Sequence, residues 1–298
     1  MKQSGEGFLC IDKPEGMSSF AVVAAVRRRF SGVKAGHAGT LDPAASGLLV
    51  LALGNATRLL PFVPLEPKQY RFGIRFGAQT DTLDADGTIV KIGGSIPSAA
   101  AFEAALTGFC GESMQAPPEY SAVKVGGVRA YRLARQGRRV ELAPRRIEIF
   151  SLHAFEYDEA AGQALLEVSC SGGTYVRSLA RDIAETLGTC GYASSLRRIA
   201  AGNFHVDRSL VFDALDRVKE ALLPVYEVLR GLPRVTVDTA QKGQLARGCD
   251  IIVELAENTE STDGNSPIFA FDVEKNIVAV LKRKEGTTYH PVRVFLKG

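Results

Sequence analysis

Residues 70–76 of this chain read YRFGIRF, and their alternation decides the fold. Tyr70, Phe72, Ile74 and Phe76 fall on one face of an extended chain, while two arginines and a glycine fall on the other. A hydrophobic period of two is typical of a half-buried β-strand. We therefore expect these residues to form a strand with one face in a core.

Strands and helices are expected to intermix on both sides of this strand. Further strands are expected over residues 8–11, 145–150 and 164–170, and helices after the capping Ser18 or Ser19 and over 95–108, 128–136 and 176–187. The order has no regular strand–helix–strand rhythm. This favours an α+β fold with a mixed, largely antiparallel sheet and flanking helices.

The pattern changes after the turn residues Gly231, Leu232 and Pro233. Five short strands are expected over residues 234–237, 251–254, 268–272, 277–282 and 292–296. A chain of 298 residues is long enough for one sizeable domain and a small accessory one. We therefore predict two domains, 1–232 and 233–298, of which the second is small and β-rich.

The composition is that of a globular protein. Hydrophobic residues make up 46% and charged residues 23%, and no apolar run is long enough to cross a membrane or to serve as a signal peptide. The five cysteines are scattered and odd in number, and the four histidines lie near none of them at ligand spacing. We therefore expect a cytoplasmic protein, a monomer with no metal, no cofactor and no membrane association.

A net charge of +3 does not by itself indicate a nucleic-acid partner, but the distribution of charge is uneven. The stretch 124–146, here called the basic segment, contains Lys124, Arg129, Arg132, Arg135, Arg138, Arg139, Arg145 and Arg146, opposed only by Glu141. Such a run forms either a solvated surface or a contact with the phosphate backbone. Both interpretations stand at this point.

The sequence GHAGTLDPAASG over residues 36–47 is a glycine-punctuated loop that leads into an apolar stretch. Loops on rigid scaffolds often carry functional residues. Asp42 in this loop, followed by Pro43, is either a turn former or a reactive carboxylate. The chain contains no phosphate-binding, dinucleotide-binding or serine-hydrolase motif, and Asp81, Asp84 and Asp86 lack calcium-loop spacing, which indicates a turn.

Four ordered segments resemble those of the bacterial tRNA pseudouridine-55 synthases, the TruB family. They are GFLCIDKP at 7–14 with Gly16 and Ser18, GHAGTLDP at 36–43 with Ala45, Ser46 and Gly47, KQY at 68–70 leading to TDT at 80–82, and SGGTYVRSL at 171–179, and a fifth piece, SLRR, follows at 195–198. The resemblance extends from about Phe8 to about Arg198. From about Pro233 the chain more loosely resembles that family's small PUA-like RNA-binding domain.

The resemblance implies a role for each matching residue. Asp42 would be the catalytic nucleophile, and Arg177 would form an ion pair that keeps its carboxylate charged and oriented. Tyr70 would stack on the target base, Tyr175 and Leu196 would line the pocket, and His37 would help to place the flipped nucleotide. Taken alone, Tyr70 and Leu196 are ordinary core residues, Arg177 can extend to solvent, His37 is an incidental loop residue, and Lys13 is structural.

The activity that the resemblance implies is isomerisation of a specific uridine to pseudouridine in the T loop of tRNA, without a cofactor. A carboxylate suits this reaction because, with a typical pKa of about 3.9, it is ionised at neutral pH and can also leave again. The sequence does not distinguish attack on the ribose from attack on the base. An insertion at about 108–155, containing Lys124, Arg129, Arg132, Arg138 and Arg139, would follow the RNA backbone.

Two other classes of function remain open at this stage. A non-enzymatic RNA-binding or RNA-folding protein would not need Asp42. A hydrolase or transferase that acts on a small molecule through an aspartyl ester would leave the basic segment and the β-rich C-terminal part without a purpose.

Overall fold

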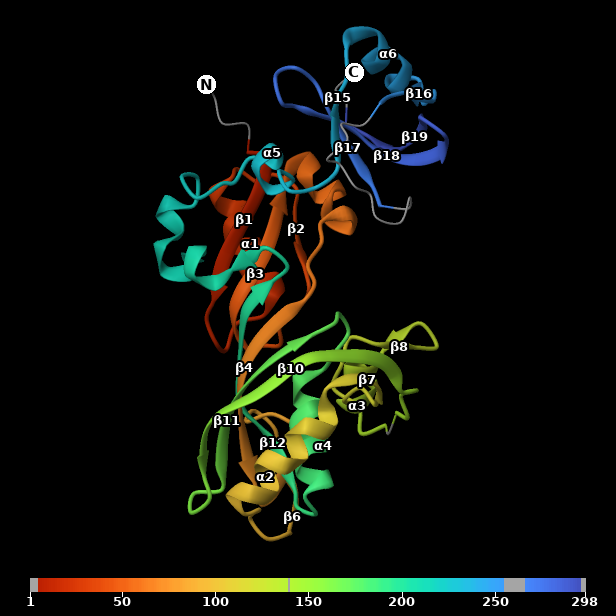
Figure 1. Cartoon of the computed structure of the whole chain (residues 1–298). Coiled ribbons are helices and arrows are strands. Elements are labelled where there is room, and N and C mark those ends of the chain that lie inside the picture. The colour runs from red at the N-terminus through yellow and green to blue at the C-terminus, as the bar shows by residue number, and fades with distance from the viewer. Residues whose placement is uncertain (1–4, 139, 255–265, 296–298) are drawn as a thin grey trace.

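The computed structural model describes residues 5–138, 140–254 and 266–295. It contains one long sheet of ten strands and, at one end, a smaller sheet of five strands, with helices packed on both (Figure 1). The sheets are mixed but largely antiparallel. The predicted α+β fold with a β-rich C-terminal domain is therefore confirmed.

The large sheet has the strand order β14-β1-β3-β12-β4-β11-β10-β7, and β2 and β13 pair with β3 and β12 respectively. Its strands are β1 (Gly7–Lys13), β2 (Ala35–Ala38), β3 (Ser46–Leu53), β4 (Lys68–Phe76), β7 (Gly111–Gln115), β10 (Arg145–Asp158), β11 (Gln163–Cys170), β12 (Gly191–Ala201), β13 (Phe204–His205) and β14 (Leu210–Val211). The alternating residues of β4 are buried as predicted: Tyr70 is 8% exposed, and Phe72, Ile74 and Phe76 are 3% exposed or less.

The strand β12 holds the two halves of the large sheet together. It pairs antiparallel with β4 along most of its length and parallel with β3 at two residues, Arg197 and Arg198. Sequence reading does not predict this strand, although it is 11 residues long. Its pattern is interrupted by irregular pairing near Ser195 and Ala200, which shifts the alternation of side chains.

The helices α1 (Ser19–Arg29) and α4 (Val176–Thr186) lie where the apolar stripes predict them, and Ser18 caps α1 by accepting a hydrogen bond from the backbone N–H of Ala21. The predicted helix 95–108 is shorter, α2 (Ala99–Leu106), capped by Ser98. Pro97 accounts for the later start, because the residue before a proline disfavours helical geometry.

The predicted helix 128–136 is wrong at its start. Residues Val128–Arg129 form β9, which pairs with β8 (Lys124–Val125), and only Ala130–Ala134 form the helix α3. The turn between the two strands consists of Gly126 and Gly127, both with positive φ. Two residues with positive φ match the twist of a tight hairpin, which explains why a hairpin replaces the first turn of the predicted helix. A second small hairpin consists of β5 (Ala78–Thr80) and β6 (Ile89–Ile92).

The five-stranded sheet has the order β15-β17-β18-β19-β16. Its strands are β15 (Arg234–Thr236), β16 (Ile251–Ile252), β17 (Ile268–Phe271), β18 (Ile277–Glu285) and β19 (Thr288–Val294). The helix α6 (Thr239–Ala246) lies between β15 and β16 in the sequence. All five predicted strands are found, although the last begins and ends earlier than 292–296. Leu296 itself lies outside the described residues.

The two parts pack together through a common apolar cluster that includes Phe8 and Leu59 from the large part and Phe271 and Phe295 from the small one. The helix α5 (Val225–Val228) lies at this junction. There the rings of Tyr226 and Phe271 pack edge to face, with 5.1 Å between their centres. The predicted boundary between residues 232 and 233 stays a prediction.

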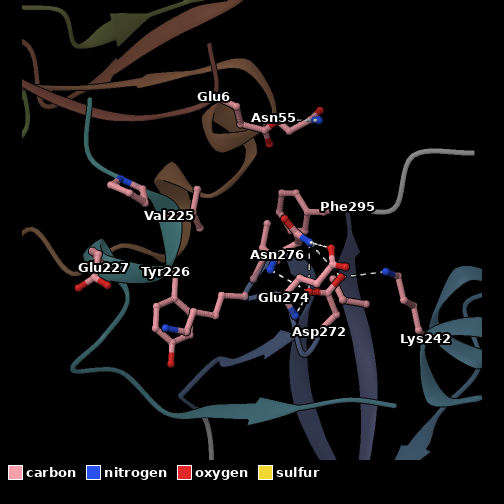
Figure 2. Close-up of a pocket in the computed structure, with 14 residues that line it drawn as sticks. Glu6, Asn55, Val225, Tyr226, Glu227, Lys242, Asp272, Glu274, Asn276 and Phe295 are labelled. Atoms are coloured by element: carbon pink, nitrogen blue, oxygen red, sulfur yellow. Dashed lines mark hydrogen bonds and ion pairs between the residues drawn. The ribbon is translucent and has the colours of Figure 1, made fainter. Parts of the chain in front are cut away.

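A cavity of about 650 Å³ opens at the same junction (Figure 2). Its walls are Glu6 and Asn55 from the large part, Tyr226 from α5, and the loop that begins at Asp272, whose carboxylate pairs with Lys242. None of the site residues predicted from the sequence lines it.

Candidate active site

Asp42 lies in the loop that connects β2 to β3. The expected loop over residues 36–47 is shorter than predicted, because Gly36, His37 and Ala38 belong to the strand β2 and pair with β3. What remains is a short segment that leads into β3 at the point where β3 pairs with β12.

Both chain neighbours of Asp42 are fixed by hydrogen bonds. The hydroxyl of Ser19 accepts from the N–H of Leu41 and donates to its carbonyl, each at 2.9 Å. The carbonyl of Pro43 accepts from the N–H of Gly16 at 2.9 Å and from the ammonium of Lys13 at 3.3 Å. The position of the Asp42 backbone is therefore set by groups from β1 and the start of α1.

Lys13 is fully buried, and its ammonium also donates to the carbonyls of Pro14 and Met17, each at 2.7 Å. Burial lowers the pKa of Lys13 to about 8, against the opposing effect of Asp42 and Glu15. This agrees with the structural role predicted for it, because a buried ammonium needs acceptors for its protons.

Arg177, on the first turn of α4, meets the Asp42 side chain. Its Nη2 lies 2.9 Å from Oδ2 of Asp42 and donates to the carbonyl of Tyr120 at 3.0 Å, while Nη1 donates to the carbonyl of Thr82 at 2.5 Å. The side chain of Arg177 is 4% exposed and that of Asp42 is 38% exposed. Arg177 thus does not extend to solvent. Its guanidinium is a buried cation in contact with an accessible carboxylate.

A second carboxylate, that of Asp84, lies on the other side of Arg177, with Oδ2 3.5 Å from Nη1. It accepts hydrogen bonds from the Thr82 hydroxyl at 2.5 Å and the Asp86 N–H at 3.2 Å. Burial raises the pKa of Asp84 above its ordinary value, and the nearby charge of Asp42 adds to this, while Thr82 and Arg177 oppose it. One guanidinium is therefore shared by two carboxylates.

Asp42, Asp84, Arg177 and Leu196 line one cavity of about 220 Å³. Its wall is completed by residues 15–16, 44–45, 85–86 and 193–195. The structure therefore brings together residues that are distant in the sequence: a loop carboxylate, a helix cation and an apolar side chain from β12. Such a cavity, with convergent polar groups, is the usual form of a small binding site.

Three other predicted residues do not line this cavity. Tyr70 is buried on β4, and burial raises its pKa against the opposing charge of Arg198. Tyr175 is half-buried at the start of α4. His37 lies on β2, where burial and the charge of Arg198 lower its pKa, and its buried Nδ1 has no hydrogen-bond partner among the described residues.

The sequence of residues 27–176 matches the family model described as TruB family pseudouridylate synthase, N-terminal domain. This span contains the Asp42 loop and ends one residue before Arg177. The chain belongs to the TruB family.

Curated relatives of this TruB-family chain support the assignment over nearly its whole length. It is 40% identical over 299 residues to a tRNA pseudouridine synthase B from Caulobacter vibrioides, covering 97% of this chain and 96% of the relative. It is 39% identical to a protein of the same name from Aquifex aeolicus, covering 84% and 88%. As a member of this family, the chain is a pseudouridine synthase, and therefore an enzyme.

Solved structures support the fold of the TruB-family chain. A chain of an H/ACA ribonucleoprotein bound to a substrate RNA containing 2′-deoxyuridine matches with a TM-score of 0.72 and 22% identity, over 98% of this chain and 85% of that one. A chain of an archaeal box H/ACA complex gives the same TM-score and identity over 98% and 86%. At this identity the likeness concerns the fold alone.

The basic segment of this TruB-family chain is exposed. Lys124, Arg129, Arg132 and Arg138 all face solvent, and Arg139 lies outside the described residues. Within the described part of the segment, only Arg146 forms an ion pair, with Glu112. A surface of cations without acidic partners is available to an anionic ligand.

Backbone contacts connect the basic segment to the site. The N–H of Ala130 donates to Val123 at 2.7 Å and that of Tyr131 to Ser121 at 3.1 Å. The adjacent residue Tyr120 supplies a carbonyl to Arg177. A few residues earlier, the Gln115 amide accepts from the N–H of Tyr175 at 2.8 Å and donates to its carbonyl at 3.2 Å, which fixes the start of α4.

Sequence reading missed two residues that contact the candidate site of this TruB-family chain. Asp84 was expected only in a turn, and it does lie in one, but its side chain faces Arg177. The signal for it was present in the TDT motif at 80–82, which places the turn beside the site. Gln115 carries no motif, and only the folded contact with Tyr175 reveals it.

Among the described residues, no group of three or more His, Cys, Asp and Glu side chains could hold a metal ion. In the same part of the chain, none of the helices is both long and apolar enough to cross a membrane.

Proposed function

We propose that this enzyme converts the uridine at position 55, in the T loop of tRNA, to pseudouridine, with Asp42 as the nucleophile. The observation that carries the proposal is the ion pair between the accessible carboxylate of Asp42 and the buried guanidinium of Arg177, in one cavity. The curated relatives at about 40% identity, named tRNA pseudouridine synthase B, support tRNA as the substrate.

The chemistry needs only the substrate and a nucleophile. The bond from ribose C1′ to uracil N1 breaks, the base turns, and a bond from C1′ to C5 forms, while C5 loses a proton and N1 gains one. Nothing is oxidised or reduced, so no redox cofactor is required. Addition of the Asp42 carboxylate to ribose C1′ and addition to the uracil ring are both compatible with its accessible position beside Arg177.

Each of the other site residues supports one part of this reaction. Arg177 holds the carboxylate in one orientation, since its own position is fixed by two carbonyls. Tyr70 stacks on the uracil, and Tyr175 and Leu196 bound the space in which the base turns. His37, whose Nδ1 has no partner among the described residues, contacts the extruded nucleotide.

The base reaches Asp42 only after it leaves the stack of the loop. Unstacking costs a few kcal/mol, which interactions with the RNA backbone must offset. The basic segment provides such interactions with Lys124, Arg129, Arg132, Arg138 and Arg139. The C-terminal part, residues 233–298, serves as a second, PUA-like RNA-binding domain.

The decisive experiment compares Asp42→Asn with wild type in conversion of tRNA, with pseudouridine mapped at single-nucleotide resolution. The amide is nearly isosteric but is not a competent nucleophile, so we expect turnover to fall by at least about 10³-fold while tRNA affinity and melting temperature stay unchanged. Asp213→Asn, at an exposed aspartate in the 3-10 helix η5 (Phe212–Arg217), is the matched control and should retain wild-type turnover.

Other outcomes would identify the competing functions. Turnover of Asp42→Asn within tenfold of wild type would contradict nucleophilic catalysis by this residue. Wild-type protein that binds tRNA but forms no pseudouridine would indicate an RNA-binding protein. Modification at a position other than 55 would leave the chemistry in place and overturn the assigned target.

A further inference from the structure

Arg198, on β12, is a buried cation that the site described above does not use directly. Its side chain is only 1% exposed and is the bulkiest of the fully buried side chains. Successive residues of a strand point to opposite faces, so Arg198 lies on the same face as Leu196, which lines the Asp42 cavity. Arg197, on the opposite face, forms a two-pronged ion pair with Asp12 instead.

The guanidinium of Arg198 contacts both ends of the loop that carries Asp42. Its Nε donates to the carbonyl of Leu48 at 2.8 Å, and its Nη2 donates to the carbonyl of Gly39 at 3.0 Å. The Gly39 carbonyl lies three residues before Asp42, and the Leu48 carbonyl lies six residues after it. One planar group therefore fixes the span of the loop from Gly39 to Leu48.

The two glycines of the loop show how closely Arg198 approaches it. A Cβ atom on Gly39 would lie 3.1 Å from Nη1 of Arg198, and one on Gly47 would lie 2.2 Å from its carbonyl oxygen. Both glycines also have positive φ, of 74° and 99°. The loop thus packs against the side chain of Arg198 at one end and against its backbone at the other.

Arg198 also acts on the residues next to the loop. It is the cross-strand neighbour of Tyr70 on β4, and its charge lowers the pKa values of His37 and Lys68, although burial has the larger effect on each. Among the described residues, no carboxylate forms an ion pair with it. Its charge is therefore compensated by backbone carbonyls.

A buried cation without a carboxylate partner is costly, because burial removes the water that would solvate its charge. What an apolar residue cannot replace is the rigid fork of donors, which holds two carbonyls in a fixed arrangement. The guanidinium is thus placed where geometry matters more than stability.

We propose that Arg198 is a positioning residue for catalysis, which sets the Asp42 loop and the Tyr70 ring relative to one another. It touches neither the reacting carboxylate nor the cavity, and it acts through the ends of the loop. The proposal rests on the proposed function, in that Asp42 is taken as the nucleophile and Tyr70 as the residue that stacks on the target base.

The test is kinetic and uses the full chain with Arg198→Met, Arg198→Lys and the matched control Arg197→Met. We expect Arg198→Met to lower the single-turnover rate at saturating enzyme by about 10²-fold, because a shift of ~1 Å in a reacting group has an effect of that size. Arg198→Lys should recover part of the rate, since an ammonium reaches one carbonyl but not both. The dissociation constant for tRNA should change less than about twofold, and Arg197→Met should react as wild type.

Amide hydrogen exchange provides a readout that does not depend on activity. In Arg198→Met, exchange of the amides in residues 39–48 should quicken relative to those of β1 and α4, and in Arg197→Met it should not. Unchanged exchange in this loop, or a wild-type rate in Arg198→Met at a temperature where it is folded, would overturn the proposal.

The same data separate this proposal from the proposed function. If Asp42→Asn remains active, the nucleophile is wrong, yet exchange in the loop still reports whether Arg198 holds it. If Asp42→Asn is inactive while Arg198→Lys and Arg198→Met lower stability without lowering the single-turnover rate, Arg198 is merely structural.

Discussion

The site around Asp42 and the basic segment are both rich in arginine, but their arginines are held in opposite ways. Arg177 and Arg198 are buried, and they donate hydrogen bonds to carbonyls or form an ion pair with a carboxylate. Arg132 and Arg138 are exposed, and neither forms an ion pair within the described residues.

The difference indicates two uses of one side chain. A buried guanidinium that is held by fixed protein acceptors orients a neighbouring group, whereas an exposed one can exchange solvent and counterions for phosphate. Changes at the first kind of arginine should therefore affect the chemical step, and changes at the second kind should affect binding. Substitution of each kind of arginine tests this division.

Among the arginines, the largest effect is expected at Arg177. Replacement by methionine removes the cation between Asp42 and Asp84, which frees the nucleophile to rotate and leaves two carboxylates near each other. We expect the single-turnover rate at saturating enzyme to fall by more than about 10²-fold, with little change in tRNA affinity. Arg177→Lys should recover little, because lysine lacks the planar fork.

Arg181, one helical turn further on, offers a comparison on the same helix. Its guanidinium binds Asp182 and the carbonyl of Ala116 rather than Asp42. Arg181→Met should therefore change stability more than rate. A variant of Arg177 that loses affinity but keeps its rate would show that Arg177 binds RNA rather than the nucleophile.

A smaller effect is expected from the basic segment. Arg132→Gln combined with Arg138→Gln should weaken tRNA binding and reduce the slope of log affinity against log salt by about one unit for each phosphate that the protein no longer neutralises. The single-turnover rate at saturating enzyme should stay close to that of wild type. Arg28→Gln with Arg29→Gln, a pair that is equally exposed at the end of α1, serves as the control.

Salt titration of tRNA binding decides the matter. If the double variant of Arg132 and Arg138 and the double variant of Arg28 and Arg29 both have the same salt slope as wild type, the basic segment is a solvated surface. If both pairs lower the slope equally, the effect is one of net charge and does not locate the RNA.

The sequence predicted most of what depends on local pattern. The alternation over residues 70–76 places β4, the capping Ser18 places α1, and the apolar stripe of residues 176–187 places α4. The same reasoning failed for β12, since its irregular pairing breaks the alternation, and for the hairpin of β8 and β9, since it consists of only two residue pairs.

The site shows the same limit at the level of individual hydrogen bonds. The Asp42 loop stood out by its glycines and its proline, and the resemblance paired it with Arg177. The hydrogen bonds of Ser19, Gln115 and Arg198 depend on long-range packing, in which partners lie 22, 60 and 159 residues apart. No local pattern encodes such distances, so the residues that orient the site became visible only in the folded chain.

The smallest effect concerns Asp84, and it appears in stability as a function of pH. The folded protein binds the Asp84 proton more tightly than the unfolded chain does, because burial raises the pKa of this carboxyl above its ordinary value of 3.8. The stability that this group contributes is fully present below 3.8 and is lost as pH rises through its folded pKa. Asparagine cannot titrate, so Asp84→Asn removes this dependence.

The melting temperature of wild type relative to Asp84→Asn should therefore decline as pH is raised from about 4 and become constant once Asp84 is ionised in the folded state. Asp213→Asn, at an exposed carboxylate, should show a much flatter difference over the same range. If the melting temperature of wild type relative to Asp84→Asn instead rose with pH, the effects of Arg177 and Thr82 on the pKa of Asp84 would outweigh that of burial. The ionised carboxylate would then stabilise the folded protein. Asp84 would then belong with the groups that hold Arg177 in place.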